Sequence, residues 1–223
     1  MSYSIAIDGP AGAGKSTIAK MIAKRRELIY VDTGAMYRAM ALHLIRNGIK
    51  PEETERISEE CINADITIRY ENKEQIVYLN GENVNAFLRT EEVGNMASKS
   101  SVNPKVREKL VSLQQKLAAT SRVIMDGRDI GTVVLPNADV KIYLTASTVV
   151  RAKRRFDELA AKGETPDFDS IEADIKERDF RDMNRDISPL KQAKDAILVD
   201  TSEMTIDEVV NKIIEISEEK GTK

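Results

Sequence analysis

The stretch "SIAIDGPAGAGKSTIAK" (residues 4–20) joins a short apolar run to a helical pattern through a glycine-rich turn. Residues 9–16 of this stretch read "GPAGAGKS" and have the spacing G-x-x-x-x-G-K-[ST]. Glycines let the backbone curl so that successive amide groups point at phosphate oxygens, and the start of the following helix adds the positive end of its dipole. We therefore expect this segment, the phosphate-binding loop, to hold a nucleoside triphosphate rather than to be a turn without a ligand.

Single residues of the phosphate-binding loop have expected tasks. Lys15 should reach the β- and γ-phosphates, and the Ser16 hydroxyl should bind Mg²⁺. The other residues expected to contact ATP here are Gly9, Pro10, Ala11, Gly12, Ala13, Gly14 and Thr17. The loop alone does not say whether the phosphoryl group goes to water or to an acceptor.

Five short apolar runs predict the strands of a parallel sheet, at residues 4–8, 28–31, 122–126, 139–145 and 196–200. Most of them lack period-two alternation, which is typical of strands covered on both faces. Helical patterns separate them, at about residues 15–26, 34–46 and 205–219. Asp32 or Thr33 is available to cap the second of these helices, and Gly48 to end it. The order predicts an α/β fold with helices flanking a five-stranded parallel sheet.

One region departs from this order. Residues 64–84 alternate with period two around polar turns, which predicts an antiparallel hairpin or small sheet inserted on the substrate side. After it, Asn103 as cap and Pro104 in the first turn predict a helix with an apolar stripe formed by Val106, Leu110, Leu113 and Leu117. The segment "KGETPDFDS" (162–170) is the best candidate for a mobile loop.

Composition limits the partners. The 223 residues include 34 basic and 37 acidic side chains, a net charge of −3, so no cationic field favours nucleic acid or a membrane surface. No window approaches the roughly 18 apolar residues of a membrane helix. A single cysteine, Cys61, excludes an intrachain disulfide, and its expected role is a small buried apolar residue. We expect a cytoplasmic protein that acts as a monomer. His43, on an apolar helix, is expected to be structural.

Arginine spacing points to an anionic acceptor, since guanidinium groups can collect two mutually repelling phosphates. The segment "RAKRR" places Arg151, Arg154 and Arg155 on neighbouring helix positions after a predicted strand. In "SIEADIKERDFRDMNRD" (170–186) one helical stripe contains Ile171, Ile175, Arg178, Asp182 and Arg185. Because the stripe changes from apolar to charged, it favours a helix that passes from the core into a polar cleft over a surface ladder of ion pairs. Asp169 and Glu172 have the spacing of a capping box at its start.

Charged residues also follow two other predicted elements. Arg38 lies in "DTGAMYR" on an otherwise apolar helix, where an unpaired charge is costly. In "MDGRDIGT" a strand end carries Asp126, Arg128 and Asp129. Asp126 has two open interpretations: orienting Mg²⁺ through water, or capping a helix.

In these stretches the sequence resembles the bacterial cytidylate kinases, P-loop nucleoside monophosphate kinases that move the γ-phosphoryl group of ATP to CMP or dCMP. The matching segments are "IAIDGPAGAGKST", "YVDTGAMYR", "NPKVRE", "DGRDIGTVV", "RAKRR" and "IKERDFRDMNRD", in the family's order. The resemblance implies one kinase domain over residues 1–223. Its core would cover about residues 1–32, 121–150 and 189–223, its monophosphate-binding region about 33–120, and its lid about 151–188. The segment "KRRELIYVD" lacks a glycine that the family often has before the second strand.

The resemblance also implies site roles. The acceptor phosphate would be held by Arg38, Arg128 and Arg185, the cytosine edge read by Ser98, Arg107 and Asp129, and the ribose bound by Arg178 and Asp182. Thr33 would touch the nucleotide, and Arg151, Arg154 and Arg155 would close over ATP. Asp129 can accept from the cytosine N4 amine while Arg107 donates to N3 and O2, a pattern that uracil partly reverses. Lys15, Arg128, Arg151, Arg155 and Arg185 would neutralise the transferring group.

Two alternatives remain at this point. One is an ATP-dependent kinase for UMP, AMP or a hydroxylated metabolite, although a metabolite acceptor needs fewer arginines. The other is a nucleotide-binding switch module. A GTPase is disfavoured because "NKEQ" (72–75) lacks the aspartate of a guanine-reading Asn-Lys-x-Asp motif.

Overall fold

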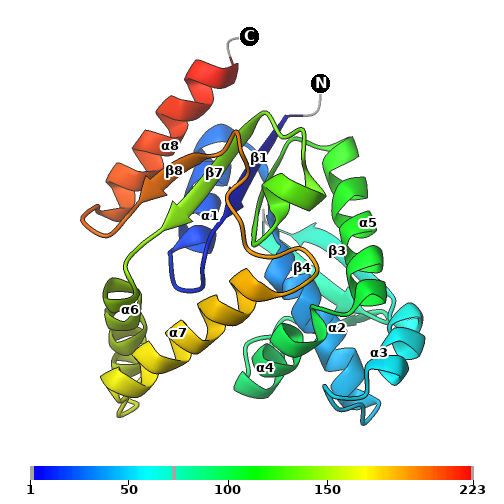
Figure 1. Cartoon of the computed structure of the whole chain (residues 1–223). Coiled ribbons are helices and arrows are strands. Elements are labelled where there is room, and N and C mark those ends of the chain that lie inside the picture. The colour runs from blue at the N-terminus through cyan, green and yellow to red at the C-terminus, as the bar shows by residue number, and fades with distance from the viewer. Residues whose placement is uncertain (1–2, 72–73, 222–223) are drawn as a thin grey trace. The chain divides into compact units, whose positions relative to one another are not determined.

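The computed structural model describes residues 3–71 and 74–221 (Figure 1). The strands are β1 Ser4–Asp8, β2 Ile29–Asp32, β3 Ile66–Glu71, β4 Glu74–Leu79, β5 Glu82–Asn83, β6 Val123–Gly127, β7 Val140–Thr145 and β8 Ile197–Asp200. The helices are α1 Lys15–Arg26, α2 Thr33–Arg46, α3 Thr54–Glu60, α4 Glu91–Ser100, α5 Pro104–Thr120, α6 Thr148–Ala161, α7 Phe168–Asn184 and α8 Ile206–Gly221. A short 3₁₀ turn, η1 (Cys61–Asn63), and a π-helical turn, η2 (Ile130–Val134), complete the described elements.

The five predicted strands form one sheet in the order β2-β6-β1-β7-β8, which confirms the predicted fold class. β1 pairs in parallel with β7, and β7 in parallel with β8. Ile5, Ala6 and Ile7 of β1 are fully buried, as expected for a strand covered on both faces.

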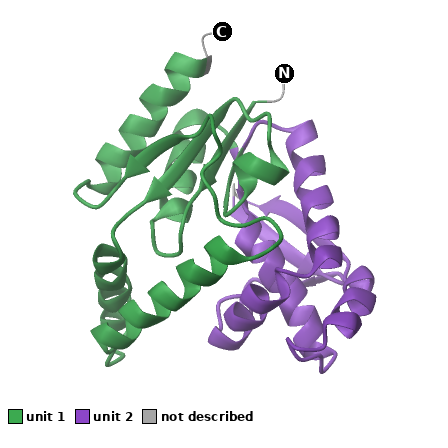
Figure 2. Ribbon diagram, in the orientation of Figure 1, with its two compact units in different colours: residues 1, 3–28, 124–223 green, residues 2, 29–123 purple. Residues whose placement is uncertain are grey.

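The chain divides into two compact units (Figure 2). Unit 1 comprises Tyr3–Leu28 and the described residues from Ile124 onward, and unit 2 comprises Ile29–Val123. The phosphate-binding loop and the "RAKRR" helix therefore belong to unit 1, and the "DTGAMYR" helix belongs to unit 2.

In unit 1, α1 contacts α8, α8 contacts β7, and α6 contacts α7. α1 has the predicted bounds and ends at Glu27, which has a left-handed φ of 52°. α7 is capped by Asp167, whose side chain accepts from Ser170 N at 2.8 Å. The predicted capping box at Asp169 and Glu172 is therefore wrong, because the helix has already begun at Phe168. The connection between α6 and α7 therefore covers only residues 162–167.

In unit 2, the predicted hairpin is confirmed as an antiparallel sheet in the order β3-β4-β5. Asp32 caps α2 by accepting from Ala35 N at 2.9 Å. His43 is buried with its Nε2 2.8 Å from Glu60 Oε1, a structural position, and Cys61 is a buried free thiol. In the described part of the chain, no helix is long and apolar enough to cross a membrane.

The start of α5 agrees with its prediction, and its buried face differs. Asn103 caps the helix through Lys105 N and Val106 N, and Pro104 is in its first turn. The buried residues are Val106, Arg107, Leu110, Gln114 and Ala118, whereas Leu113 and Leu117 of the predicted stripe are only half-buried. Compared with the prediction, the buried face of the helix is shifted toward the side of Arg107 and Gln114. An apolar stripe does not predict this shift, because both of these side chains are polar.

Candidate active site

The phosphate-binding loop connects β1 to α1 in unit 1, as predicted. Gly9 has a φ of 152°, and a Cβ there would lie 1.9 Å from the carbonyl oxygen of Leu144 in β7. No side chain fits, so glycine is required for the loop to leave the strand. Gly14, with a φ of 87°, is the residue before α1 and turns the chain into the helix. The first amides of a helix have no partner within the helix, so those of α1 are available to bind an anion.

Lys15 is folded back into the phosphate-binding loop. Its Nζ donates to Pro10 O at 2.7 Å and the residue is buried. Burial first, and then the neighbouring Arg128 charge, lower the pKa of Lys15 to about 7 against the opposing effect of Asp126 and Asp8. Both effects favour an anion beside Lys15, because a phosphate would stabilise the charged form of the buried ammonium.

Ser16 and Asp126 form the predicted pair of oxygen groups. The Ser16 hydroxyl donates to Asp126 Oδ2 at 2.9 Å. Asp126 lies inside β6 and is buried, and η2 begins only after Asp129, so the helix-cap interpretation of Asp126 is wrong. A hydroxyl and a carboxylate are oxygen donors of the kind that Mg²⁺ prefers.

Asp8 is a site residue that sequence reasoning missed. Its two carboxylate oxygens accept from Ile130 N and Gly131 N, each at 2.7 Å. Burial raises the pKa of Asp8 to about 6, although both amide hydrogen bonds act in the opposite direction. The carboxylate thus joins the end of β1 to the turn that follows Arg128 and Asp129. The available signal was an acidic residue that ends an apolar strand directly before the loop.

Arginines gather around Asp182 near the end of α7. Arg128 Nε donates to Asp182 Oδ2 at 2.7 Å. Burial opposes ionisation of Asp182, but the charges of Arg128, Arg178 and Arg185 outweigh it and lower the pKa of this carboxyl. This grouping favours the polar-cleft interpretation of the stripe over a surface ladder. Arg185 lies just past the helix, where its Nε donates to Ser188 O at 2.5 Å, so the predicted helical stripe is wrong at its last member.

The three arginines of "RAKRR" have three different partners. Arg151 is buried and donates to Ala146 O at 2.9 Å, to Ala11 O at 3.1 Å and to Asp179 Oδ2 at 2.6 Å. Arg154 donates to Thr201 O at 2.8 Å. Arg155 is exposed and pairs with Glu158 at 3.0 Å. Asp179, also missed from the sequence, connects α7 to Arg151.

In unit 2, Thr33 and Arg38 lie on the first turns of α2. Thr33 is buried, and Arg38 is half-buried. A Cβ at Gly34 would lie 3.4 Å from Arg38 Nη1, so the guanidinium lies over the first turn of the helix. Within residues 3–71 and 74–221, no side chain or backbone group forms a hydrogen bond or ion pair with the Arg38 guanidinium.

Arg107 and Ser98 also belong to unit 2. Arg107 is buried on α5, where its Nη1 donates to Ser101 O at 3.3 Å and its guanidinium lies 5.8 Å from the centre of the Tyr37 ring. Ser98 is half-buried on α4, which contacts α2. Tyr37, the neighbour of Arg38, was missed from the sequence although it stands in the quoted "DTGAMYR" segment.

Comparison with known proteins identifies the family. The family model "Cytidylate kinase" matches residues 5–219, nearly the whole chain. This chain belongs to the cytidylate kinase family. The cytidylate kinase of Caldicellulosiruptor saccharolyticus is 51% identical, with 96% of this chain and 94% of that protein covered. The cytidylate kinase of Enterococcus faecalis is 46% identical, with 98% and 96% covered.

Solved structures share the fold with this cytidylate kinase family member. A gluconokinase from Sinorhizobium meliloti has a TM-score of 0.50 at 13% identity, covering 98% of this chain and 95% of that chain. A shikimate kinase from Bacteroides thetaiotaomicron has a TM-score of 0.50 at 14% identity, covering 97% and 98%. An uncharacterized protein from Eubacterium ventriosum has a TM-score of 0.54 at 12% identity, covering 98% and 99%. At these identities the likeness concerns the fold alone.

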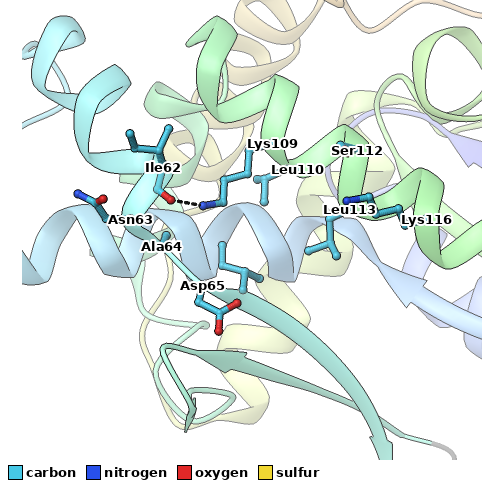
Figure 3. Close-up of a pocket in the computed structure, with 10 residues that line it drawn as sticks. Ile62, Asn63, Ala64, Asp65, Lys109, Leu110, Ser112, Leu113 and Lys116 are labelled. Atoms are coloured by element: carbon cyan, nitrogen blue, oxygen red, sulfur yellow. Dashed lines mark hydrogen bonds between the residues drawn. The ribbon is translucent and has the colours of Figure 1, made fainter.

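A surface cavity in unit 2 is separate from the residues that the family resemblance assigns to nucleotides. It has a volume of about 430 Å³ and lies between η1, the start of β3 and α5 (Figure 3). Lys109 Nζ donates to Ile62 O at 2.7 Å along its wall. The lining contains no arginine and none of the predicted site residues, so this cavity is not the candidate nucleotide site.

Proposed function

We propose that this member of the cytidylate kinase family transfers the γ-phosphoryl group of ATP to CMP or dCMP, giving CDP or dCDP. The observation that carries the residue assignment is the phosphate-binding loop, where the buried Lys15 Nζ donates to Pro10 O at 2.7 Å and the Ser16 hydroxyl donates to Asp126 Oδ2 at 2.9 Å. A cation and a hydroxyl–carboxylate pair at the start of one helix are the groups that a triphosphate and its magnesium ion require. We further propose ATP, CMP and dCMP as its partners, and a monomer acting in the cytoplasm.

The donor end of the site would be the phosphate-binding loop. The curled backbone of residues 9–14 and the first amides of α1 would bind the β- and γ-phosphate oxygens. Lys15 would exchange its bond to Pro10 O for phosphate oxygens, which restores a full positive charge to a buried ammonium. Arg151, already bonded to Ala11 O, would hold the loop from the α6 side.

The pairing of Ser16 with Asp126 fits a magnesium ion delivered with ATP. The Ser16 hydroxyl would be a direct ligand and Asp126 would orient a ligand water, since both groups are oxygen donors and already lie 2.9 Å apart. When bound, Mg²⁺ neutralises charge on the β- and γ-phosphates.

The acceptor phosphate would be held by Arg38, Arg128 and Arg185. Arg38 favours this role because it is half-buried and has no partner among the described residues. Arg128 is oriented by Asp182, and Arg178 with Asp182 would bind the ribose. Thr33, at the start of α2, would touch the nucleotide.

The cytosine would be read by Ser98, Arg107 and Asp129. Asp129 is buried and, as a carboxylate, accepts from an amine but cannot donate to the O4 of uracil. Arg107 is oriented by Ser101 O and the Tyr37 ring and donates to ring nitrogen or oxygen acceptors. Unpaired buried groups are costly, so UMP should be the poorer acceptor.

In the transfer step, an oxygen of the acceptor phosphate attacks the γ-phosphorus of ATP. The bond between that phosphorus and the β–γ bridging oxygen breaks, and ADP leaves with the electron pair. The attacking oxygen is already anionic, so no general base is needed. Lys15, Arg128 and Arg185 would neutralise the charge of the transferring phosphoryl group. Arg155, exposed on α6, would approach ATP when the lid closes over it.

A coupled ADP-release assay tests the proposal with CMP, dCMP, UMP, AMP and shikimate as acceptors. We expect fast turnover with CMP and dCMP only. Preference for UMP, AMP or shikimate would identify another acceptor, and ATP binding without acceptor-dependent ADP release would identify a switch module. Arg38→Ala should raise the KM for CMP while leaving the KM for ATP unchanged, and the exposed Arg56→Ala, at a surface pair with Glu53, is its matched control.

A further inference from the structure

The inserted antiparallel sheet of unit 2 contacts the start of α2 through one carboxamide. Gln75 lies in β4, opposite Tyr70 of β3. Its Oε1 accepts from Asp32 N at 2.9 Å, and its Nε2 donates to Asp32 O at 3.2 Å. Both backbone groups of one residue, 43 positions away, are therefore held by a single side chain.

Asp32 stands at the junction of β2 and α2. It ends β2 and caps α2, with its side chain accepting from Ala35 N at 2.9 Å. Thr33 is the next residue, and Arg38 lies further along the same helix. A Cβ added at Gly34 would lie 3.2 Å from Asp32 Oδ1 and 3.4 Å from Arg38 Nη1, so the carboxylate and the guanidinium flank the same turn.

Gln75 is itself held in place. Asn85 Nδ2 donates to Gln75 O at 3.1 Å, and Asn85 Oδ1 accepts from Val77 N at 2.9 Å. Val77 and Leu79 of β4 are buried, and β4 contacts both β2 and α2. The carboxamide is thus presented from an anchored strand, which is what a positioning group requires.

We propose that Gln75 is a positioning residue for the acceptor nucleotide: by holding both backbone groups of Asp32, it sets where Thr33 and Arg38 meet CMP. This inference rests on the proposed function, since it takes Thr33 and Arg38 as acceptor-binding residues. The inserted sheet would thus help to position the acceptor-binding residues, although Gln75 touches no reacting atom.

The chemistry requires a carboxamide. Gln75 donates and accepts at once, glutamate only accepts, and methionine fills the same volume with neither group. Loss of both hydrogen bonds should let the α2 start move, so Gln75→Met and Gln75→Ala should raise the KM for CMP about tenfold, the equivalent of about one net hydrogen bond. Gln75→Glu should lie between them and the wild type. The KM for ATP and kcat at saturating CMP should stay within about twofold of the wild type.

The experiment measures steady-state KM and kcat for both nucleotides in wild type, Gln75→Ala, Gln75→Met, Gln75→Glu and the control Gln192→Ala. Gln192 lies in unit 1, is exposed, and donates to Ala196 O at 2.8 Å, so the control removes the same kind of bond elsewhere. Amide exchange of Asp32, which should accelerate in Gln75→Met and not in Gln192→Ala, is a second readout. If Gln75→Ala does not fold, Gln75→Met and Gln75→Glu decide the question.

Three results overturn the inference. A KM for CMP in Gln75→Met equal to that of Gln192→Ala shows that the carboxamide does not position the acceptor. Equal rises in the KM for CMP and ATP show a general structural defect. Absence of CMP phosphorylation by the wild type overturns the proposed function together with this inference, whereas the first two results leave the proposed function standing.

Discussion

Replacing Asp8 by asparagine should change how stability depends on pH. The pKa of Asp8 rises from 3.8 to about 6 because of burial. In the folded state the carboxyl therefore keeps its proton to higher pH than in the unfolded chain. Because the folded state binds more protons between these values, stability is greatest below the unfolded pKa and is lost as pH rises through the folded pKa.

The size of the effect follows from the two pKa values. A shift of one pKa unit corresponds to about 1.4 kcal/mol, so the contribution approaches about 3 kcal/mol at neutral pH, of which about 2.4 kcal/mol develops between about pH 4 and pH 7.5. The carboxamide of the Asp8→Asn variant does not ionise in this range. It accepts through one oxygen only, so the variant loses one of the bonds from Ile130 N and Gly131 N at every pH.

The assay is urea unfolding of wild type and Asp8→Asn at about pH 4, 5, 6 and 7.5. The wild-type stability minus the variant stability should fall by about 2.4 kcal/mol over the range, whatever its absolute value. Asp139→Asn supplies the baseline, because Asp139 is an exposed carboxylate that also accepts from a backbone amide, Ser4 N, at 2.8 Å. A difference between wild type and Asp8→Asn that stays constant with pH would show that folding does not raise the pKa of Asp8.

Three further predictions concern the donor loop, the base site and the end of α1. Binding of ATP near pH 8 should take up a proton, because burial lowers the pKa of Lys15 to about 7 and a bound phosphate restores its charge. Calorimetry in two buffers of different ionisation enthalpy measures this proton uptake. Equal heats of ATP binding in the two buffers would contradict it. Asp129→Ala should raise the KM for CMP and reduce the preference for CMP over UMP by about tenfold or more, measured by ADP release, and unchanged CMP and UMP rates would remove Asp129 from the base site. Glu27→Gly should stabilise the protein by about 1 kcal/mol, because Glu27 has a left-handed φ of 52°. The urea midpoint should rise in Glu27→Gly. It should not rise in the control Lys24→Gly, which introduces glycine at an exposed helical position of α1. No rise in Glu27→Gly would mean that the turn is unstrained.

Local patterns in the sequence were sufficient for most of the fold. The phosphate-binding loop, the bounds of α1, the five sheet strands and the cap of α5 depend on residues within a few positions of one another. Glycine spacing, capping residues and apolar runs act over that same range, so they predict these features correctly. The family resemblance rests on such short segments in a fixed order, and the match over residues 5–219 confirms it.

Local patterns could not predict which side chains distant in the sequence contact one another. Spacing placed Arg151, Arg154 and Arg155 on neighbouring helix positions, but it did not predict that Arg151 is buried and donates to Ala11 O, 140 positions away, while Arg155 is exposed. The buried face of α5 includes Arg107, whose guanidinium lies 5.8 Å from the centre of the Tyr37 ring in α2. The hydropathy of a residue indicates whether it prefers burial or water. It does not indicate which residues surround it in the fold.

Short stretches of sequence were enough to predict the phosphate-binding loop and the order of strands and helices, because these depend on residues within a few positions of one another. The hydrogen bonds from Ile130 N and Gly131 N to Asp8, and from Asp32 N to Gln75, can be seen only in the folded chain. These bonds span 122, 123 and 43 positions. Such pairs form only when folding brings distant strands and turns together, so no local spacing encodes them.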